Sequence, residues 1–134
     1  MLESTLAMPT IPAALLRRLY VPGSLRNLGS GFVLALKNII APGTIVSVGS
    51  IVVDDKAYGP ELITVTGRGQ PRPADRIHAK SPLDFPINQI VTFQVAAAPL
   101  GAGLHRLRVS ILTREVGELV VEAQDQVADA ESSF

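Results

Sequence analysis

The sequence predicts an all-β domain, an antiparallel β-sandwich of seven to eight strands. Apolar and polar side chains alternate with a period of two residues over most of positions 19–127, and glycine, proline or acidic residues interrupt this alternation at short intervals. Hydrophobic residues make up 47% of the chain but aromatic residues only 4%, so the core must consist mainly of Val, Ile, Leu and Ala. Such aliphatic and β-branched side chains pack well on pleated sheets.

The chain has the length of one domain with a substantial hydrophobic core. We expect residues 1–14 to form a partly disordered lead-in, residues 15–127 the single sandwich domain, and residues 128–134 a flexible tail. Residues 13–20 fit either one helical turn or the start of an edge strand. Glu3 and two prolines argue against a secretory signal, and no apolar stretch is long enough to span a bilayer, so we expect a cytoplasmic protein with no membrane partner.

The expected strands follow one another between recognisable turns. They cover approximately residues 19–21, 32–37, 44–53, 56–58, 63–66, 91–95, 107–111 and 119–123. Residues 44–53 form either one long strand or two pieces bent by a bulge at Gly49. The turn spacing is typical of an immunoglobulin-like or fibronectin-like sandwich, although the chain has no cysteine pair and no tryptophan to indicate an antibody-type domain.

Residues 67–88 break the alternation. This segment is rich in proline and basic residues and has little periodicity. A long irregular segment inside a compact β domain is more often functional than idle. We therefore expect it to face a partner, and we expect its part between Arg68 and Ser81 to be separable from folding.

Charge and composition exclude several classes of function. Twelve basic residues balance twelve acidic ones, and the arginines are scattered, so the sequence lacks the basic stripe of a nucleic-acid-binding protein. A net charge of zero gives little self-repulsion and so favours association with another subunit or a second copy. The absence of cysteine excludes disulfides, thiolate metal sites and cysteine nucleophiles.

No cluster of residues predicts catalysis or metal binding on this chain. His78 and His105 are the only histidines, and a metal site needs at least one further ligand beside them. We interpret His105 as a partly buried structural residue, because it begins an alternating strand. We interpret Asp54, Asp55 and Glu115 as solvated turn residues.

The candidate residues for binding a partner or ligand lie in the two least regular segments. They are Arg26, Asn27, Arg68, Arg72, Arg76 and His78. Two interpretations of the first segment remain open. Ser24 and Asn27 hydrogen-bond the local backbone, or Arg26 makes a bidentate contact with a carboxylate of this chain or of a partner.

Four segments resemble the small (β) subunits of bacterial C-glycoside deglycosidases and their uncharacterised relatives. They are VPGSLRNLGSGFVLALKN (21–38), VDDKAYGPELITV (53–65), FPIN (85–88) and PLGAGLHRLRVSI (99–111). The resemblance implies a β-sandwich that packs on a larger barrel-type subunit similar to sugar isomerases. It also implies that the divalent metal and the acid–base residues of the carbon–carbon lyase belong to that partner, with no cofactor on this chain.

Two functions follow as hypotheses. The first is a non-catalytic accessory subunit that packs on the barrel subunit and orders the mouth of its active site. The alternative is a binding or assembly module that forms a homo-oligomer and has no enzyme partner. Neither a nucleophile with its base nor three convergent metal ligands is recognisable in the sequence, so a free-standing enzyme is not favoured.

Overall fold

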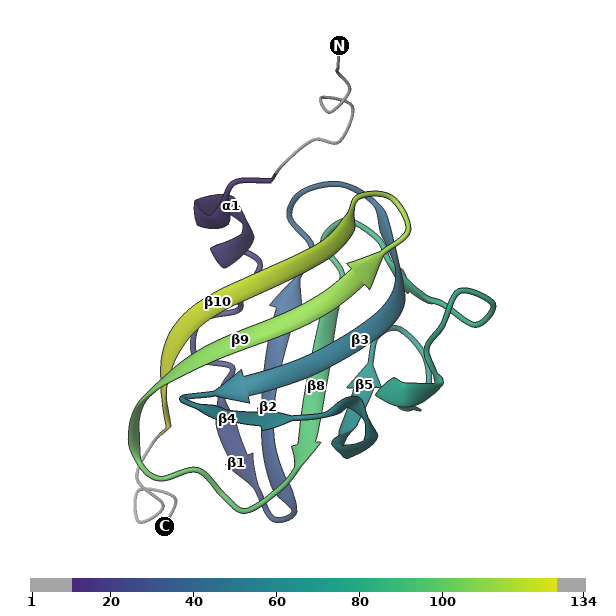
Figure 1. Ribbon diagram of the computed structural model, residues 1–134. Helices are drawn as coiled ribbons and strands as arrows, with labels where there is room; N and C mark the ends of the chain where they lie inside the picture. Colours follow the sequence, from purple (N-terminus) through teal and green to yellow (C-terminus); the bar gives the residue numbers. More distant parts are fainter. Residues whose placement is uncertain (1–10, 128–134) are drawn as a thin grey trace.

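Two antiparallel sheets pack face to face in the computed structural model, which describes residues 11–127. One sheet has the strand order β1-β2-β8-β5-β6, and the other has the order β10-β9-β3-β4 with β7 also paired to β3. The strands are β1 (Arg26–Leu28), β2 (Gly31–Lys37), β3 (Gly43–Val53), β4 (Lys56–Tyr58), β5 (Ile63–Thr66), β6 (Arg72–Pro73), β7 (Leu83–Phe85), β8 (Ile90–Ala96), β9 (Gly103–Thr113) and β10 (Gly117–Val127). Figure 1 shows β10, β9 and β3 crossing in front of β2 and β8. The predicted all-β sandwich is confirmed.

The strand order is that of an immunoglobulin domain. Such domains pair strands A-B-E-D in one sheet and C-F-G in the other, and some add a strand C′ beside C. The order β1-β2-β8-β5 reproduces A-B-E-D, and the order β10-β9-β3-β4 reproduces G-F-C-C′. The strand order therefore agrees with the immunoglobulin-like sandwich that the spacing of turns predicts.

The number of strands differs from the prediction of seven to eight, because ten strands lie in residues 11–127. The additional strands β1, β6 and β7 have only two or three residues each, which is too short to show a two-residue period. Conversely, the strand expected at residues 19–21 is reduced to one isolated bridge between Tyr20 and Leu36.

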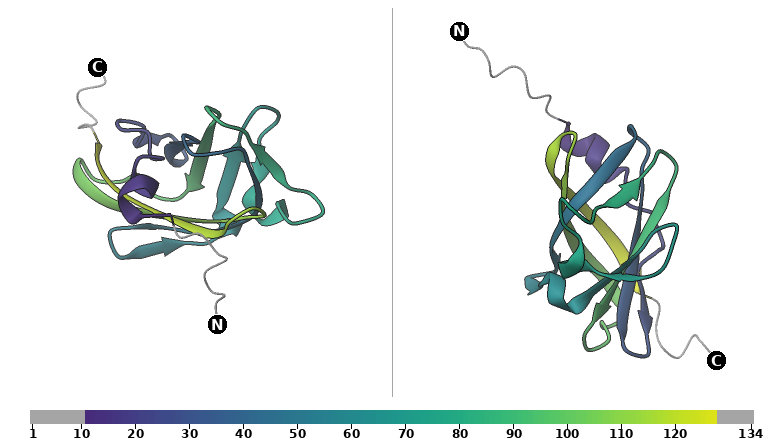
Figure 2. Two further views of the ribbon diagram at one scale, coloured as in Figure 1. Left: turned by 90° about the horizontal axis from the view of Figure 1, so that it is seen from above. Right: turned by 90° about the vertical axis from the view of Figure 1, so that its right-hand side faces the viewer.

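The N-terminal part of the described chain combines both alternatives left open for residues 13–20. Helix α1 (Ala13–Arg17) is a short turn of helix, and the bridge at Tyr20 follows it directly. Both views of Figure 2 place α1 beside β10, and the two elements are in contact. Two 3-10 turns, η2 (Pro60–Leu62) and η3 (Ala74–Arg76), complete the elements. The predicted lead-in and tail fall mostly in residues 1–10 and 128–134, outside the described residues.

The core lies between the sheets and follows the predicted strand faces. Alternate residues of β2 and β8 point inward from one sheet, and alternate residues of β9 and β10 point inward from the other. The fully buried large side chains include Phe32, Leu34, Leu36, Val91, Phe93, Val95, Ile45, Ile51 and Ile111. Phe32 of β2 meets the ring of Tyr58 of β4 edge-on, with 5.3 Å between the ring centres, so aromatic contacts also join the two layers.

Strand β3 is continuous but bulged twice. The register against β9 shifts between Val48 and Ile51, at the predicted Gly49, and shifts again between Ile45 and Ser47. Each bulge inserts an extra residue, so inward-facing side chains at these places are three residues apart. A Cβ atom at Gly49 would lie 3.1 Å from the Cβ atom of Ser110 on β9, which explains the glycine at this bulge.

The long segment 67–88 is part of the fold, which argues against the expectation that its residues 68–81 are separable from folding. Its strand β6 pairs with β5, its strand β7 pairs with β3, and Ala74, Ile77 and Phe85 are buried in the core. The guanidinium of Arg72 donates hydrogen bonds to the carbonyl oxygens of Pro82 and Ser81, at 2.8 and 2.7 Å, and so closes the segment on itself. The sequence did not predict that these three side chains are buried, because their uneven spacing produces no regular alternation of apolar and polar residues.

Asp125 on β10 ties the N-terminal segment to the second sheet. Its Oδ2 atom accepts hydrogen bonds from the Tyr20 hydroxyl at 2.5 Å and from the backbone N–H groups of Gly23 at 2.9 Å and Leu25 at 3.3 Å. Burial opposes ionisation of Asp125, but these donors, with the N–H of Gln126, lower its pKa on balance. Burial, and next the bond to Asp125, raise the pKa of Tyr20.

Replacing Asp125 with asparagine should lower the free energy of unfolding by about 2 kcal/mol at pH 7, because a charged acceptor of three hydrogen bonds is lost. The pKa of Asp125 is depressed in the folded state, so its stabilisation is present above the ordinary Asp pKa of about 3.9 and is lost as the pH falls through the folded value. Urea unfolding between pH 2 and pH 7, at pH values spaced by about one unit, should show wild type and variant converging at low pH. The control Glu122→Gln, which removes an exposed ion pair, should cost less than about 1 kcal/mol, and an equal loss in both variants would contradict the assignment.

Candidate interaction surface

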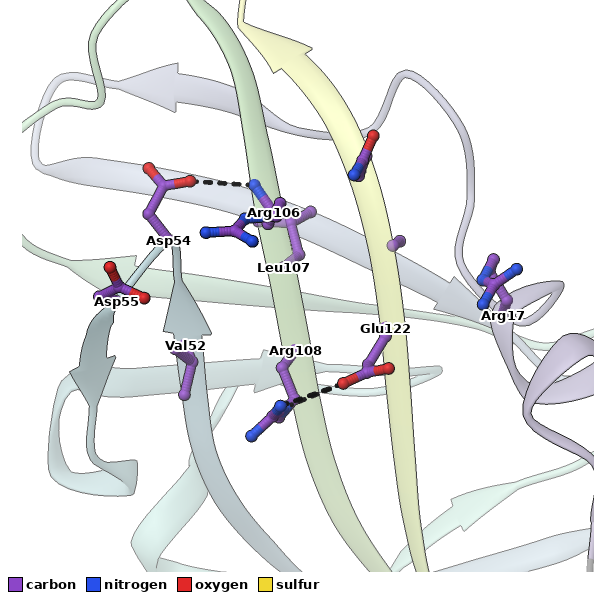
Figure 3. Close-up of a pocket in the computed structure, with 10 residues that line it drawn as sticks. Arg17, Val52, Asp54, Asp55, Arg106, Leu107, Arg108 and Glu122 are labelled. Carbon is purple, nitrogen blue, oxygen red and sulfur yellow. Dashed lines mark hydrogen bonds and ion pairs between the residues drawn. The ribbon is translucent and has the colours of Figure 1, made fainter.

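A groove of about 840 Å³ crosses the outer face of the β10-β9-β3-β4 sheet. Figure 3 shows Asp54 and Asp55 at one side of it and Arg17 of α1 at the other, with β9 and β10 passing between them. Because β9 alternates, Leu107 and its inward neighbours support the core while Arg106 and Arg108 project outward. The groove is therefore lined by the outward-facing polar residues of the same strands whose inward-facing residues build the core.

The β9–β10 hairpin determines which side chains meet in the groove. Its register places Arg108 opposite Glu122 and Arg106 opposite Gln124. Arg108 and Glu122 form an ion pair of 3.1 Å, and both side chains are more than half exposed, at 56% and 55%. A pair this exposed stabilises the fold little and leaves both groups accessible to a partner.

The groove has three arginines and three carboxylates, and in the described part of the chain its two unengaged arginines outnumber its one unengaged carboxylate, Asp55. Arg17, Arg106 and Arg108 line it together with Asp54, Asp55 and Glu122. Glu122 is paired with Arg108, and Asp54 is held by His105 and the backbone N–H of Arg106. Within residues 11–127 the structure records no ion pair or hydrogen bond for the guanidinium groups of Arg17 and Arg106. Arginine can bind carboxylates in a bidentate manner, so this surface suits an acidic partner.

Apolar side chains flank the charged part of the face. Leu104 and Leu112 lie on β9 at even spacing from Arg106 and Arg108, so they share their face, and they are 59% and 42% exposed. Protein interaction surfaces combine exposed apolar and polar side chains. The face therefore offers charged recognition at its centre and apolar contact at both ends of one strand.

A hydrogen-bonded histidine closes one end of this surface. His105 Nδ1 lies 2.9 Å from Asp54 Oδ2, and His105 Nε2 lies 2.7 Å from the carbonyl oxygen of Gly101. The His105 side chain is only 12% exposed. The interpretation of His105 as a partly buried structural residue is thus confirmed, whereas Asp54 is more than a solvated turn residue.

The residues predicted to bind a partner do not gather at one place. Asn27 and Arg72 are used internally, since the amide of Asn27 exchanges two hydrogen bonds of 2.8 Å with the backbone of Leu100. Ser24 accepts a hydrogen bond from the N–H of Ala35. Ser24 and Asn27 thus both bond the backbone, but the partner of Asn27 is 73 residues away in the sequence and is not local. The remaining candidates are exposed side chains outside the groove: Arg26, Arg68, Arg76 and His78.

The sequence did not predict the groove residues, because what brings them together is the pairing register of β9 with β10. Arg106, Arg108 and Glu122 are visible as the polar half of two alternating strands. Only the pairing of β9 with β10 through a three-residue turn brings them together. Glu115 was also missed as a structural residue, because its carboxylate accepts hydrogen bonds from the N–H and the hydroxyl of Thr44, at 2.9 and 2.8 Å.

A second hollow of about 80 Å³ lies at the end of the sandwich near α1. Apolar residues including Leu19, Phe85 and Leu119 line it. The amide of Asn38 at its wall donates to the carbonyl oxygens of Ala41 and Phe85 and is fully engaged. In residues 11–127 no group of three or more histidine or acidic side chains is placed to hold a metal ion.

A protein-family description, hydroxymethylglutaryl-CoA reductase, N-terminal domain, matches residues 15–128. The chain belongs to this family. The match begins inside α1 and ends one residue beyond β10, so the reductase N-terminal-domain family corresponds here to the whole sandwich with part of its helix. No curated protein matches the chain. Within residues 11–127 no helix has the length and apolar character needed to cross a bilayer.

Proposed function

We propose that this chain is a non-catalytic accessory domain that docks on a larger catalytic subunit or domain through the outer face of the β10-β9-β3-β4 sheet. The observation that carries the proposal is the groove itself, where Arg17 and Arg106 have no carboxylate partner within residues 11–127. Acidic side chains of a partner would pair with these arginines, and Leu104 and Leu112 would add apolar contact.

Two independent likenesses support an accessory role. The family is described as the N-terminal domain of hydroxymethylglutaryl-CoA reductase, which is a part of a larger protein. The resemblance to the small subunits of C-glycoside deglycosidases remains a prediction, and it also describes a sandwich that accompanies a catalytic barrel. In this proposal the partner carries the reacting groups and any divalent metal, and the sandwich orders the mouth of the partner's active site.

Site-specific photocrosslinking tests the docking face. Because the chain has no cysteine, Gln124→Cys provides a single attachment point in the groove, and Gln94→Cys provides a matched exposed point on β8 of the opposite sheet. Each variant, labelled with a benzophenone, is mixed with a reductase catalytic domain and, separately, with a sugar-isomerase-like barrel protein from the same organism. We expect a crosslink from position 124 that is at least about tenfold stronger than from position 94, and a loss of most of it in Arg106→Glu, because hot spots dominate binding.

Equal crosslinking from both positions, or none from position 124 with either protein, would overturn the docking face. The second candidate function, a homo-oligomer, is favoured by the mixed charges of this face and by the zero net charge of the chain. Light scattering of the isolated chain measures its molar mass and so distinguishes the homo-oligomer from the accessory domain. A stable dimer that crosslinks to itself through position 124 and ignores both added proteins would replace the accessory role with self-assembly.

A further inference from the structure

His105 connects two turns that are far apart in the sequence. Its Nδ1 atom faces Asp54 Oδ2 in the turn between β3 and β4, and its Nε2 atom faces the carbonyl oxygen of Gly101 in the loop before β9. Both partner atoms are oxygens that only accept hydrogen bonds, since the first belongs to a carboxylate and the second to the backbone. The backbone N–H of Arg106 donates to the other oxygen of Asp54, so this carboxylate is fixed from two sides.

The protonation state of the ring follows from these two acceptors. A neutral imidazole carries one N–H and can satisfy only one of them, whereas the imidazolium carries two N–H groups and satisfies both. The pKa of His105 is raised, first by the Gly101 carbonyl and then by Asp54. The pKa of Asp54 is lowered, first by His105 and then by the N–H of Arg106, in agreement with an ion pair.

We propose that His105 is a proton-dependent clamp: as an imidazolium it holds the Asp54 turn and the Gly101 loop together, and on losing its proton it releases one of them. The proton leaves to solvent, and the remaining N–H can serve either oxygen but not both. This inference goes beyond the accessory role proposed above and does not depend on it.

The other charged groups around the ring leave this assignment intact. On β10, Asp125 is the register partner of His105, and its carboxylate is engaged by Tyr20, Gly23 and Leu25. Asp55 lies beside Asp54 in the turn, and the loop of residues 97–103 contains no titratable side chain. Arg106 follows His105 on β9 and points to the groove, and its charge contributes to the lowered pKa of Asp54. The charged group that acts on the ring is the carboxylate of Asp54, and it favours the imidazolium.

Opening the clamp alters the groove. Asp54 lines the groove and is 49% exposed. When His105 is neutral the site loses one positive charge, and where the remaining N–H serves the Gly101 carbonyl oxygen the Asp54 carboxylate also becomes available to the neighbouring groove cations. Acidic ligands of this face would be held more strongly with the clamp closed.

NMR titration of the full chain tests the clamp. The chain has only two histidines, so the ring signals of His105 can be assigned with the variant His78→Gln. We expect the ring nitrogens of His105 to show the doubly protonated state above the ordinary histidine pKa of about 6.5. The backbone amides of Asp54, Asp55, Gly101 and Ala102 should shift with the same midpoint as the His105 ring.

The variant Asp54→Asn should move the midpoint of His105 towards the ordinary histidine pKa of about 6.5, and His105→Gln should abolish the pH-dependent amide shifts. His78→Gln should leave all of these signals unchanged. If His105→Gln does not fold, the wild-type titration and Asp54→Asn still decide the question. A His105 midpoint at or below the ordinary histidine pKa, one neutral ring tautomer throughout, or amides of the two turns that do not follow the His105 midpoint would each overturn the clamp.

Discussion

Replacing Phe93 with alanine is expected to lower the free energy of unfolding by about 4 kcal/mol, because the truncation leaves a cavity in a closely packed core. Phe93 is fully buried at the middle of β8, where the register places it beside Leu34 of β2 and Val65 of β5. The chain has only four phenylalanines, so few large side chains fill the space between the sheets. Its aliphatic neighbours are themselves fully buried and cannot collapse far into the vacated volume.

Urea denaturation followed by circular dichroism measures this loss. The matched control is Gln94→Ala, the next residue of β8, whose side chain points to solvent and should change stability by no more than about 0.5 kcal/mol. The contrast between two adjacent positions depends only on the two-residue alternation. A small effect at Phe93, or equal effects at both positions, would show that the inward face of β8 is misassigned.

The strands with a clear period could be predicted from the sequence alone, and for a physical reason. In β2, β8, β9 and β10 each inward side chain contributes to one core, so the alternation is a direct record of which face is buried. For strand β3 the sequence left open one long strand or a bulge at Gly49, and the structure has a continuous strand with that bulge. The other register shift, between Ile45 and Ser47, involves no glycine or proline, so the sequence contains no signal for it. The short strands carry too few residues to display any period.

The candidate surface could be predicted only in part, because its organisation depends on contacts between residues distant in sequence. Asp54 and His105 are separated by 51 positions, and Tyr20 and Asp125 by 105. Local patterns contain no information about such pairs. Two adjacent aspartates are common in a hairpin turn, so the sequence gives no reason to assign them another role. Only the folded structure shows that Asp54 contacts His105 of the neighbouring strand β9.

The structure of segment 67–88 argues against the expectation drawn from its sequence. Proline and arginine content indicated a surface connection that serves a partner. The structure instead uses it to cover one edge of the core: β6 extends one sheet, β7 pairs with the other, and η3 places Ala74 inside. Proline restricts the backbone of such a segment, so it can be well ordered without forming long strands.

Replacing Ile77 with alanine is therefore expected to lower the free energy of unfolding by about 3 kcal/mol, as for other buried aliphatic residues. Ile77 is 4% exposed and belongs to the core cluster, whereas its neighbour His78 is exposed and bridges to Ser81 only through the backbone. The variant His78→Ala should accordingly change stability by less than about 0.5 kcal/mol. Urea denaturation of both variants, compared with partner crosslinking at position 124, separates folding from docking. A wild-type stability for Ile77→Ala would mean that the segment is peripheral to the core and would restore the original expectation of a separable loop.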